Sequence, residues 1–251
     1  MPVNLKIQTD ASVTEKDILS IIQSFEDEGE MIGEGTRNVI KILPFRGKLY
    51  NIKSFKIPNI VNKIAYRFFR KSKAQRSYEF ANKLIDLGIG TPRPIAYYQQ
   101  TTLFAFRKSY YISEQLDYDL TYRELITNFD YEDYDTILRA FTQFTYKLHE
   151  KGIHFLDHSP GNTLIKKVDD DYAFYLVDLN RMQFGPMDFE TRIKNFSRLT
   201  KYKYMVEIMS DEYAKCSNRT YNEVFPLMWK DVKAFREKFE RKKRIKKRFG
   251  L

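Results

Sequence analysis

The sequence contains a single cysteine, Cys216, so no disulfide can form within the chain, and we expect this residue to be an inert part of a helix. Long apolar runs are also missing, because charged residues interrupt every segment well before the roughly 20 residues that a membrane-spanning helix needs. The first residues do not show the basic stretch followed by an apolar stretch that is typical of a secretory signal. These absences predict a cytoplasmic protein that does not span a membrane.

The composition is that of a folded chain, with 43% hydrophobic and 16% aromatic residues. This is enough to bury the core of one large domain or of two small lobes. The net charge of +10 is unevenly distributed. Residues 233–251 hold ten Lys and Arg against two Glu, and residues 62–76 hold six Lys and Arg and no acid. The protein therefore has two basic segments rather than a uniformly basic surface.

The basic segment 233–251 is predicted to form an amphipathic helix. Five apolar residues fall on one broad stripe, opposite most of the charge: Val232, Phe235, Phe239, Ile245 and Phe249. Basic helices of this kind lie on anionic membrane surfaces, so we expect peripheral association with the inner face of the cytoplasmic membrane. Two other interpretations are a solvated chain end and a nonspecific phosphate contact with nucleic acid.

The first half of the chain shows the alternation of apolar and polar residues that is typical of strands. Residues 31–56 predict two antiparallel strands, with Arg46 and Gly47 at the turn between them. Residues 91–98 and 106–116 predict two more strands around a second turn. An antiparallel sheet is therefore expected in this half.

Two helices are predicted in the same half. Residues 14–25 place their isoleucines and a phenylalanine on one face, and Thr14 and Asp17 make a plausible capping pair. Residues 72–87 also have an apolar face, and Gly88 ends this helix.

The second half is predicted to be mostly helical. Helices are expected at 124–129, at 134–152 and along most of the chain after Thr191, and only the short strands 163–167 and 172–178 interrupt them. This order predicts an α+β fold with two lobes, residues 1–116 and residues 117–251, and no sequence repeat.

Three oxygen-bearing side chains are predicted to converge beside the two short strands. Asp157 and Asn162 lie in the loop before the first strand, and Asp178 ends the second. Because the two strands form a hairpin, its ends should meet. Carboxylate and amide oxygens suit Mg²⁺ bound to a triphosphate, and the carboxylate five residues before the amide can accept the proton of an attacking hydroxyl. The turn-forming residues between them also fit an ordinary tight turn.

The spacing of these residues resembles that of the protein-kinase-like phosphotransferases, whose catalytic loop reads D-x-x-x-x-N and whose metal-binding Asp follows the next hairpin. Here the loop is D-H-S-P-G-N at 157–162 and the second motif is D-L-N at 178–180. Within this superfamily the chain looks most like the bacterial lipopolysaccharide kinases, which phosphorylate Kdo or heptose. That likeness rests on DLNRMQF at 178–184 and on FFRKSKAQRSYEFA at 68–81, and the whole resemblance covers roughly 31–200.

The resemblance implies ATP and Mg²⁺ as cofactors, with a two-lobed protein-kinase-like fold. Asp157 would be the catalytic base, and Asn162 and Asp178 would bind the metal. A kinase also needs a lysine on the third strand, held by a glutamate of the first-lobe helix. Lys53 in YNIKSFK and Glu79 in RSYEFA match these positions, and Lys56 is the alternative to Lys53 because a slip in strand register would exchange them.

The nucleotide is expected to contact four further positions of the first lobe. Gly33 and Gly35 in IGEGTRN resemble a shortened glycine-rich loop, which brings backbone N–H groups close to phosphate. Glu114 and Leu116 lie where the two lobes are predicted to join.

Departures from the kinase pattern point to the acceptor. Phe155 and Leu156 replace the His and Arg that usually precede the catalytic Asp, and Ser159 replaces the catalytic-loop lysine of protein kinases. The segment 181–191 is too short for a peptide-binding platform. A glycan or lipid-linked sugar hydroxyl is therefore the expected acceptor.

A second class of function stays open, in which the chain is a catalytically degenerate kinase-fold scaffold or a nucleic-acid-binding protein. Joint retention of the lysine, glutamate, asparagine and two aspartates favours catalysis, because a scaffold has no use for all five. His154 and His158 are four residues apart but have no third ligand nearby, so packing is favoured over zinc binding.

Overall fold

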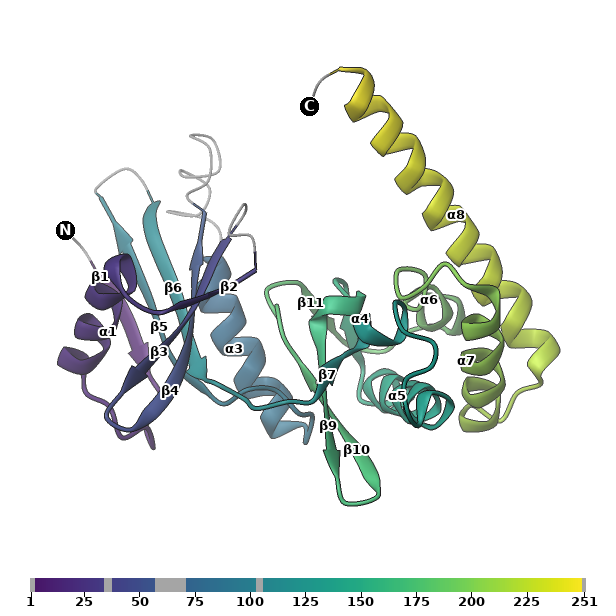
Figure 1. Cartoon of the computed structure of the whole chain (residues 1–251), viewed down its shortest axis with the longest axis horizontal. Helices are drawn as coiled ribbons and strands as arrows, with labels where there is room; N and C mark the ends of the chain where they lie inside the picture. The colour runs from purple at the N-terminus through teal and green to yellow at the C-terminus, as the bar shows by residue number, and fades with distance from the viewer. Residues whose placement is uncertain (1–2, 34–37, 57–70, 103–105, 250–251) are drawn as a thin grey trace. The chain divides into compact units, whose positions relative to one another are not determined.

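The computed structural model describes residues 3–33, 38–56, 71–102 and 106–249 (Figure 1). The chain divides into two compact units. The first comprises Met1–Asp117 together with Asp178–Asn180, and the second comprises Tyr118–Val177 and Arg181–Leu251.

The first unit is built on a six-stranded sheet in the order β1-β5-β6-β4-β3-β2, in which all neighbours are antiparallel. Its strands are β1 (Val3–Ile7), β2 (Glu30–Ile32), β3 (Asn38–Phe45), β4 (Lys48–Phe55), β5 (Pro94–Thr101) and β6 (Phe106–Glu114). Arg46 and Gly47 join β3 to β4 with φ of 47° and 76°. Positive φ at both central residues is what a two-residue hairpin turn of type I′ requires, so the predicted hairpin is confirmed.

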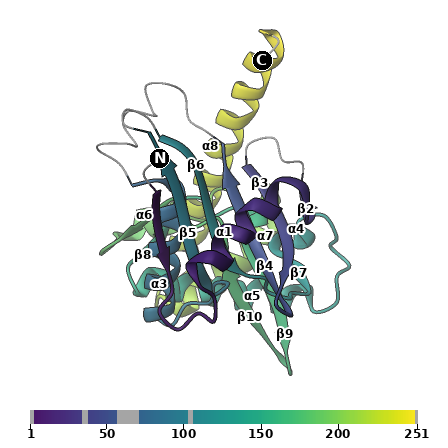
Figure 2. The same cartoon turned by 90° about the vertical axis from the view of Figure 1, so that its left-hand side faces the viewer.

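The two faces of this sheet carry different helices, because successive side chains of a strand point to opposite sides. Tyr50 and Ile52 of β4 pack in one apolar cluster with Ile18 and Ile21 of α1 (Glu15–Asp27). Phe55 packs in another cluster. That cluster contains Ala74 and Tyr78 of α3 (Lys73–Asp86). Figure 2 shows α1 lying across the near face of the sheet.

Helices α1 and α3 both begin at a capping residue, and the predicted Thr14–Asp17 cap of α1 is confirmed. The Thr14 hydroxyl accepts a hydrogen bond from the N–H of Asp17 at 3.3 Å, and the Asp17 carboxylate accepts one from the N–H of Thr14 at 2.8 Å. The Ser72 hydroxyl accepts a hydrogen bond from the N–H of Gln75 at 3.0 Å. Each such cap contributes about 1 kcal/mol to helix stability, which explains why these two starts are legible in the sequence.

The second unit is mainly helical, with two small antiparallel sheets. Its helices are α4 (Tyr122–Leu125), α5 (Tyr134–Glu150), α6 (Phe189–Lys194), α7 (Lys203–Cys216) and α8 (Tyr221–Arg248), with a 3₁₀ turn at Pro160–Asn162. One sheet is β10-β9-β7, formed by β7 (Leu120–Thr121), β9 (Thr163–Val168) and β10 (Asp171–Leu176). The other pairs β8 (Ile153–Phe155) with β11 (Met182–Phe184). The β8–β11 pair and strand β1 were not predicted.

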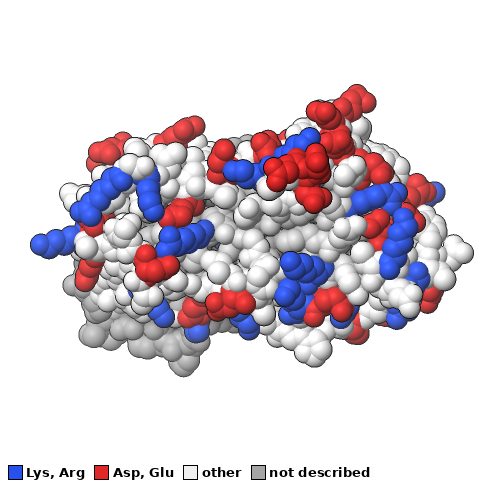
Figure 3. Space-filling view, turned by 90° about the horizontal axis from the view of Figure 1, so that it is seen from below, with Lys and Arg blue, Asp and Glu red and all other residues white. Residues whose placement is uncertain are grey.

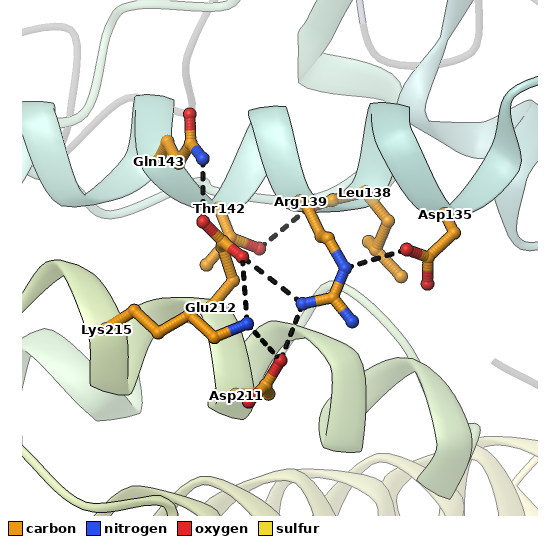
Figure 4. Close-up of polar contacts among 8 residues, drawn as sticks. All are labelled: Asp135, Leu138, Arg139, Thr142, Gln143, Asp211, Glu212 and Lys215. Carbon is orange, nitrogen blue, oxygen red and sulfur yellow. Dashed lines mark hydrogen bonds and ion pairs between the residues drawn. The ribbon is translucent and has the colours of Figure 1, made fainter.

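A single large apolar core joins α4, α5, α6, α7 and α8 of the second unit, and it includes Leu138, Phe141, Phe196, Met209 and Val224. Beside it, a polar network ties α5 to α7 (Figure 4). Arg139 donates to Asp135 at 2.7 Å, to Asp211 at 2.6 Å and to Glu212 at 3.2 Å. These contacts raise the pKa of Arg139, the bond to Asp211 being the largest cause.

Helix α8 begins in this core and continues beyond it (Figure 1). Val224, Met228 and Val232 are buried. Phe239 and Ile245 are 48% and 50% exposed. Val232 lies one turn after Met228 and packs into the core, so it does not contribute to the exposed part of the predicted stripe. The exposed apolar residues of the basic segment begin at Phe239.

No helix in the described part of the chain is both long enough and apolar enough to cross a membrane. On the face shown in Figure 3, Lys and Arg side chains are interspersed with Asp and Glu side chains. This mixing agrees with the concentration of excess charge in two segments of the sequence.

Candidate active site

The backbones of Gly152 and Gly185 lie close together just before the loop that carries Asp157. Gly152 follows α5 with φ of 66°, and a Cβ there would lie 2.8 Å from the carbonyl oxygen of Gly185. The N–H of Gly185 donates to the carbonyl of Gly152 at 2.8 Å. Only glycine allows both the left-handed backbone and this contact, so Gly152 ends α5 and directs the chain into β8 and the loop.

The predicted catalytic loop is closed by Asn162. Its side-chain amide nitrogen donates to the carbonyl of Asp157 at 2.7 Å, and its backbone N–H donates to the carbonyl of Ser159 at 2.9 Å. Val177 donates to the carbonyl of Asn162 at 3.0 Å, so the β9–β10 hairpin returns the chain to this loop one residue before Asp178. Since the amide nitrogen is engaged, the amide oxygen of Asn162 is the atom that can ligate a cation.

Two arginines hold the carboxylate of Asp157. Arg198 Nη1 donates to Asp157 Oδ1 at 2.8 Å and also to the carbonyl of Leu156 at 3.1 Å. Arg181 Nη1 donates to the same Oδ1 at 3.1 Å. The Asp157 side chain is only 15% exposed. Oδ1 thus accepts hydrogen bonds from the guanidinium groups of Arg198 and Arg181. Oδ2 is the other carboxylate oxygen and is the one that can accept a proton.

Sequence reasoning missed both arginines. Arg181 lies inside the D-L-N-R run that carried the resemblance, so a signal for it was present in the sequence. Arg198 lies 41 residues after Asp157, beyond the end of α6, and no motif marks it.

A buried polar network supports the same loop from behind. Asn195 donates to the carbonyl of Phe155 at 2.9 Å and lies 3.2 Å from Nε2 of His149, whose Nδ1 lies 2.9 Å from the Tyr213 hydroxyl. Burial lowers the pKa of His149 to about 4. Burial also lowers the pKa of His158, the residue after Asp157, to about 3. His149 and His158 are therefore both neutral near pH 7.

His158 packs among aromatic rings, as the sequence favoured. Its ring lies 5.4 Å from that of Phe141 and 5.8 Å from that of Phe155, and neither of its nitrogens has a hydrogen-bond partner among the described residues. Within the described ranges no three His, Cys, Asp or Glu side chains group as a metal site. A metal held here would therefore need ligands of other kinds, such as an amide or phosphate.

In the first unit, Lys53 pairs with Asp178. Lys53 Nζ lies 2.5 Å from Asp178 Oδ1, and Asn180 donates to the same oxygen at 2.7 Å. Lys53 is 8% exposed. Asp178 has φ of 58°, a left-handed backbone that is uncommon outside glycine. Since Oδ1 of Asp178 accepts both hydrogen bonds, Oδ2 is the oxygen of this carboxylate that could ligate a cation such as Mg²⁺.

Lys53 and Lys56 differ in position. Lys53 and Phe55 are two residues apart in β4, so their side chains point to the same face of the sheet, which α3 covers. Lys56 follows the end of the strand and is exposed. This geometry supports Lys53 as the lysine that contacts phosphate.

The expected ion pair between Lys53 and Glu79 is not formed between these described residues. Glu79 instead accepts hydrogen bonds from Lys71 at 2.8 and 3.0 Å and from Gln75 at 3.0 Å. Gln75 is four residues earlier on α3, so it shares the helix face with Glu79. The Glu79 carboxylate therefore bonds to Lys71 and Gln75, and Lys53 forms its ion pair with Asp178 instead.

Four other residues were expected to contact the nucleotide, and three of them lie in the described part of the chain. Gly33 follows β2 with φ of 76° in open space, which suits a backbone approach to phosphate. Gly35 lies outside the described residues. The Glu114 carboxylate bonds to Lys48 at 3.3 Å and to Arg93 at 3.5 Å. Leu116 is half-buried.

Comparison with known proteins gives a family and a fold. Residues 33–222 match the family described as "Lipopolysaccharide kinase (Kdo/WaaP) family". No curated protein matches the sequence. Among solved structures, "WaaP in complex with acyl carrier protein" is similar with a TM-score of 0.63 and 15% identity, over 95% of this chain and 98% of that one. A MAP kinase, LmaMPK10 from Leishmania major, is similar with a TM-score of 0.47 and 16% identity, over 78% and 59% of the two chains. The predicted kinase-like α+β fold is confirmed.

Proposed function

Because the chain belongs to the lipopolysaccharide kinase (Kdo/WaaP) family, we propose that it transfers the γ-phosphoryl group of ATP to a sugar hydroxyl. The proposed acceptor is the lipopolysaccharide inner core or a related lipid-linked glycan. The observation that carries the proposal is the loop 157–162, in which two arginines orient the Asp157 carboxylate and Asn162 closes the turn.

The proposed chemistry assigns one task to each of these groups. The acceptor oxygen attacks the γ-phosphorus, the bond from that phosphorus to the bridging oxygen of ADP breaks, and the hydroxyl proton goes to Oδ2 of Asp157. Lys53 holds the α- and β-phosphates. Asn162 and Asp178 would hold Mg²⁺, which would neutralise charge on the phosphates.

The acceptor class rests on the family and on the departures of the loop. Residues 181–191 form β11 and the start of α6 with a short connection, which leaves little chain for a peptide-binding platform. Incubating the protein with γ-labelled ATP and fractionated lipid A–core material tests the assignment. Label in the core oligosaccharide supports it, and label confined to added peptides would contradict it.

We propose further that residues 233–249, the last part of α8 and its C-cap, bind the anionic inner face of the cytoplasmic membrane. Phe239, Ile245 and Phe249 are 48%, 50% and 69% exposed on a helix rich in Lys and Arg. Exposed apolar side chains favour a lipid surface over nucleic acid, because phosphate contacts with a duplex need only the charges. Co-sedimentation with anionic vesicles in the presence of competing duplex decides between them: transfer of the protein to the duplex would contradict the membrane assignment.

A further inference from the structure

The carboxylate of Asp157 lies in a cluster with surplus positive charge. Arg198 and Arg181 both donate to its Oδ1, at 2.8 and 3.1 Å, so two guanidinium groups face one carboxylate. Neither arginine makes another ion pair with a described residue. One positive charge therefore stays uncompensated beside the proposed base.

The two arginines are held very differently. Arg198 is 35% exposed, bridges Asp157 and the carbonyl of Leu156 through Nη1, and lies over the ring of Phe235 at 5.8 Å. Its Nε is buried. These contacts fix the guanidinium, so Arg198 is a positioning residue for Asp157.

Arg181 is exposed and lightly held. Its side chain is 56% exposed, and among the described residues its guanidinium makes one hydrogen bond, to Asp157. Its backbone is anchored, because its carbonyl accepts a hydrogen bond from the N–H of Leu156 at 3.2 Å. A guanidinium has five N–H donors, so most donors of Arg181 face solvent next to the base. An ion pair whose arginine is mostly exposed to water is weak, so exchanging its carboxylate for another oxyanion costs little.

We infer that Arg181 binds an oxyanion of the acceptor, a carboxylate or a phosphate adjacent to the hydroxyl that is phosphorylated. Guanidinium groups bind both oxyanions through paired N–H donors. The inference rests on the proposed function, since it assumes that the acceptor hydroxyl meets Asp157. It adds to that function a requirement for negative charge on the acceptor.

When Arg181 turns to the acceptor oxyanion, Oδ1 of Asp157 keeps its hydrogen bond from Arg198 at 2.8 Å. Arg198 therefore still positions Asp157 while Arg181 holds the acceptor, in a loop that has Ser159 instead of a lysine.

The test uses de-acylated inner-core oligosaccharide in three forms: intact, dephosphorylated, and carboxyl-reduced. Wild type, Arg181→Gln and Arg181→Lys are compared with Arg219→Gln. Arg219 is a matched control, because it is 42% exposed and pairs with a single carboxylate, that of Glu223, at 3.3 Å. The acceptor KM, the ATP KM and kcat are measured for each protein.

We expect Arg181→Gln to raise the KM for intact acceptor about tenfold, which corresponds to about 1.4 kcal/mol. The ATP KM should stay at the wild-type value, and Arg181→Lys should recover part of the loss. The form that lacks the anion bound by Arg181 should show the same tenfold rise in KM with wild-type protein, and Arg181→Gln should not raise the KM for that form further. A purely structural role of Arg181 would instead lower kcat equally for all three forms, and this result would overturn the inference.

Equilibrium binding of the same oligosaccharides separates this inference from the proposed function. If wild type phosphorylates none of the three forms, the proposed function fails. The anion site still stands if wild type binds intact oligosaccharide more tightly than one of the anion-depleted forms and Arg181→Gln removes that preference. Equal binding of all forms by wild type, no binding of any form, or an unchanged preference in Arg181→Gln overturns it.

Discussion

Replacing Arg198 by alanine is expected to slow phosphoryl transfer while nucleotide binding is retained. The reason is geometric: Nη1 of Arg198 bridges the carbonyl of Leu156 and the Oδ1 of Asp157, at 3.1 and 2.8 Å. Alanine removes both contacts and the packing of the guanidinium over Phe235. The carboxylate of Asp157 then keeps only the exposed Arg181 as a partner.

The size of the effect follows from these contacts. Hydrogen bonds to charged groups contribute about 1.5–3 kcal/mol each. Arg198 is 35% exposed, so water replaces part of what is lost, and we expect the two contacts together to contribute about 1.5–3 kcal/mol. If this energy orients Asp157 for proton transfer, kcat should fall by about 10- to 100-fold.

A double-mutant cycle with Asp157→Asn checks whether Arg198 acts through Asp157. Turnover is measured for wild type, both single variants and the double variant, together with ATP binding and thermal unfolding. In the Asp157→Asn background, Arg198→Ala should change the residual rate by no more than about twofold. Arg219→Ala is the control, since Arg219 also lies over a phenylalanine ring, that of Phe189, at 3.9 Å. Wild-type turnover in Arg198→Ala, or an equal slowing in both backgrounds, would refute the reasoning.

Four further substitutions test the metal ligand, the phosphate lysine and the buried histidine. Asp178→Ala should weaken Mg-ATP binding by removing a carboxylate ligand; a Mg²⁺-dependent thermal shift with ATP that survives the change would assign the metal to another group. Lys53→Met should raise the ATP KM at least tenfold, about 1.4 kcal/mol, and Lys56→Met should not, because Lys56 is exposed beyond β4; the reverse order would exchange their roles. Burial lowers the pKa of His158 from 6.5 to about 3, so the unfolded chain binds a proton that the folded chain does not, and the free energy of unfolding falls as pH decreases below about 6.5. His158→Leu should lose less stability between pH 7 and pH 4.5 than wild type in denaturant unfolding, and equal losses would contradict the burial argument.

Local features of the fold were predictable because short-range chemistry determines them. The turn at Arg46 and Gly47 needs two residues with positive φ, and the start of α1 needs a hydroxyl and an acid three residues apart, at Thr14 and Asp17. Strand β1 was missed because its partner β5 comes about ninety residues later, with Val3 opposite Gln100. Nothing near Val3 in the sequence reveals that partner.

The candidate site also combines local contacts, which the sequence predicts, with contacts between residues far apart in the sequence, which it does not. The spacing of Asp157 and Asn162 is local, and the bond between the Asn162 amide and the Asp157 carbonyl joins residues five apart. The partners of the charged groups are not local. Arg198 is 41 residues from Asp157, and Lys53 is 125 residues from Asp178. Pairings at such distances depend on how the elements pack, so the Lys53–Glu79 pair expected from the resemblance could not be checked from sequence.

The convergence of Asp157, Asn162 and Asp178 on one Mg-ATP stays a prediction, as does the base role of Asp157. The base role is tested by measuring transfer of label from γ-labelled ATP to lipid A–core oligosaccharide by wild type and by Asp157→Asn, with ATP affinity measured on the same samples. We expect label in the core with wild type, at least a hundredfold less with the variant, about 2.7 kcal/mol, and equal ATP affinity. Unchanged transfer by Asp157→Asn would contradict it.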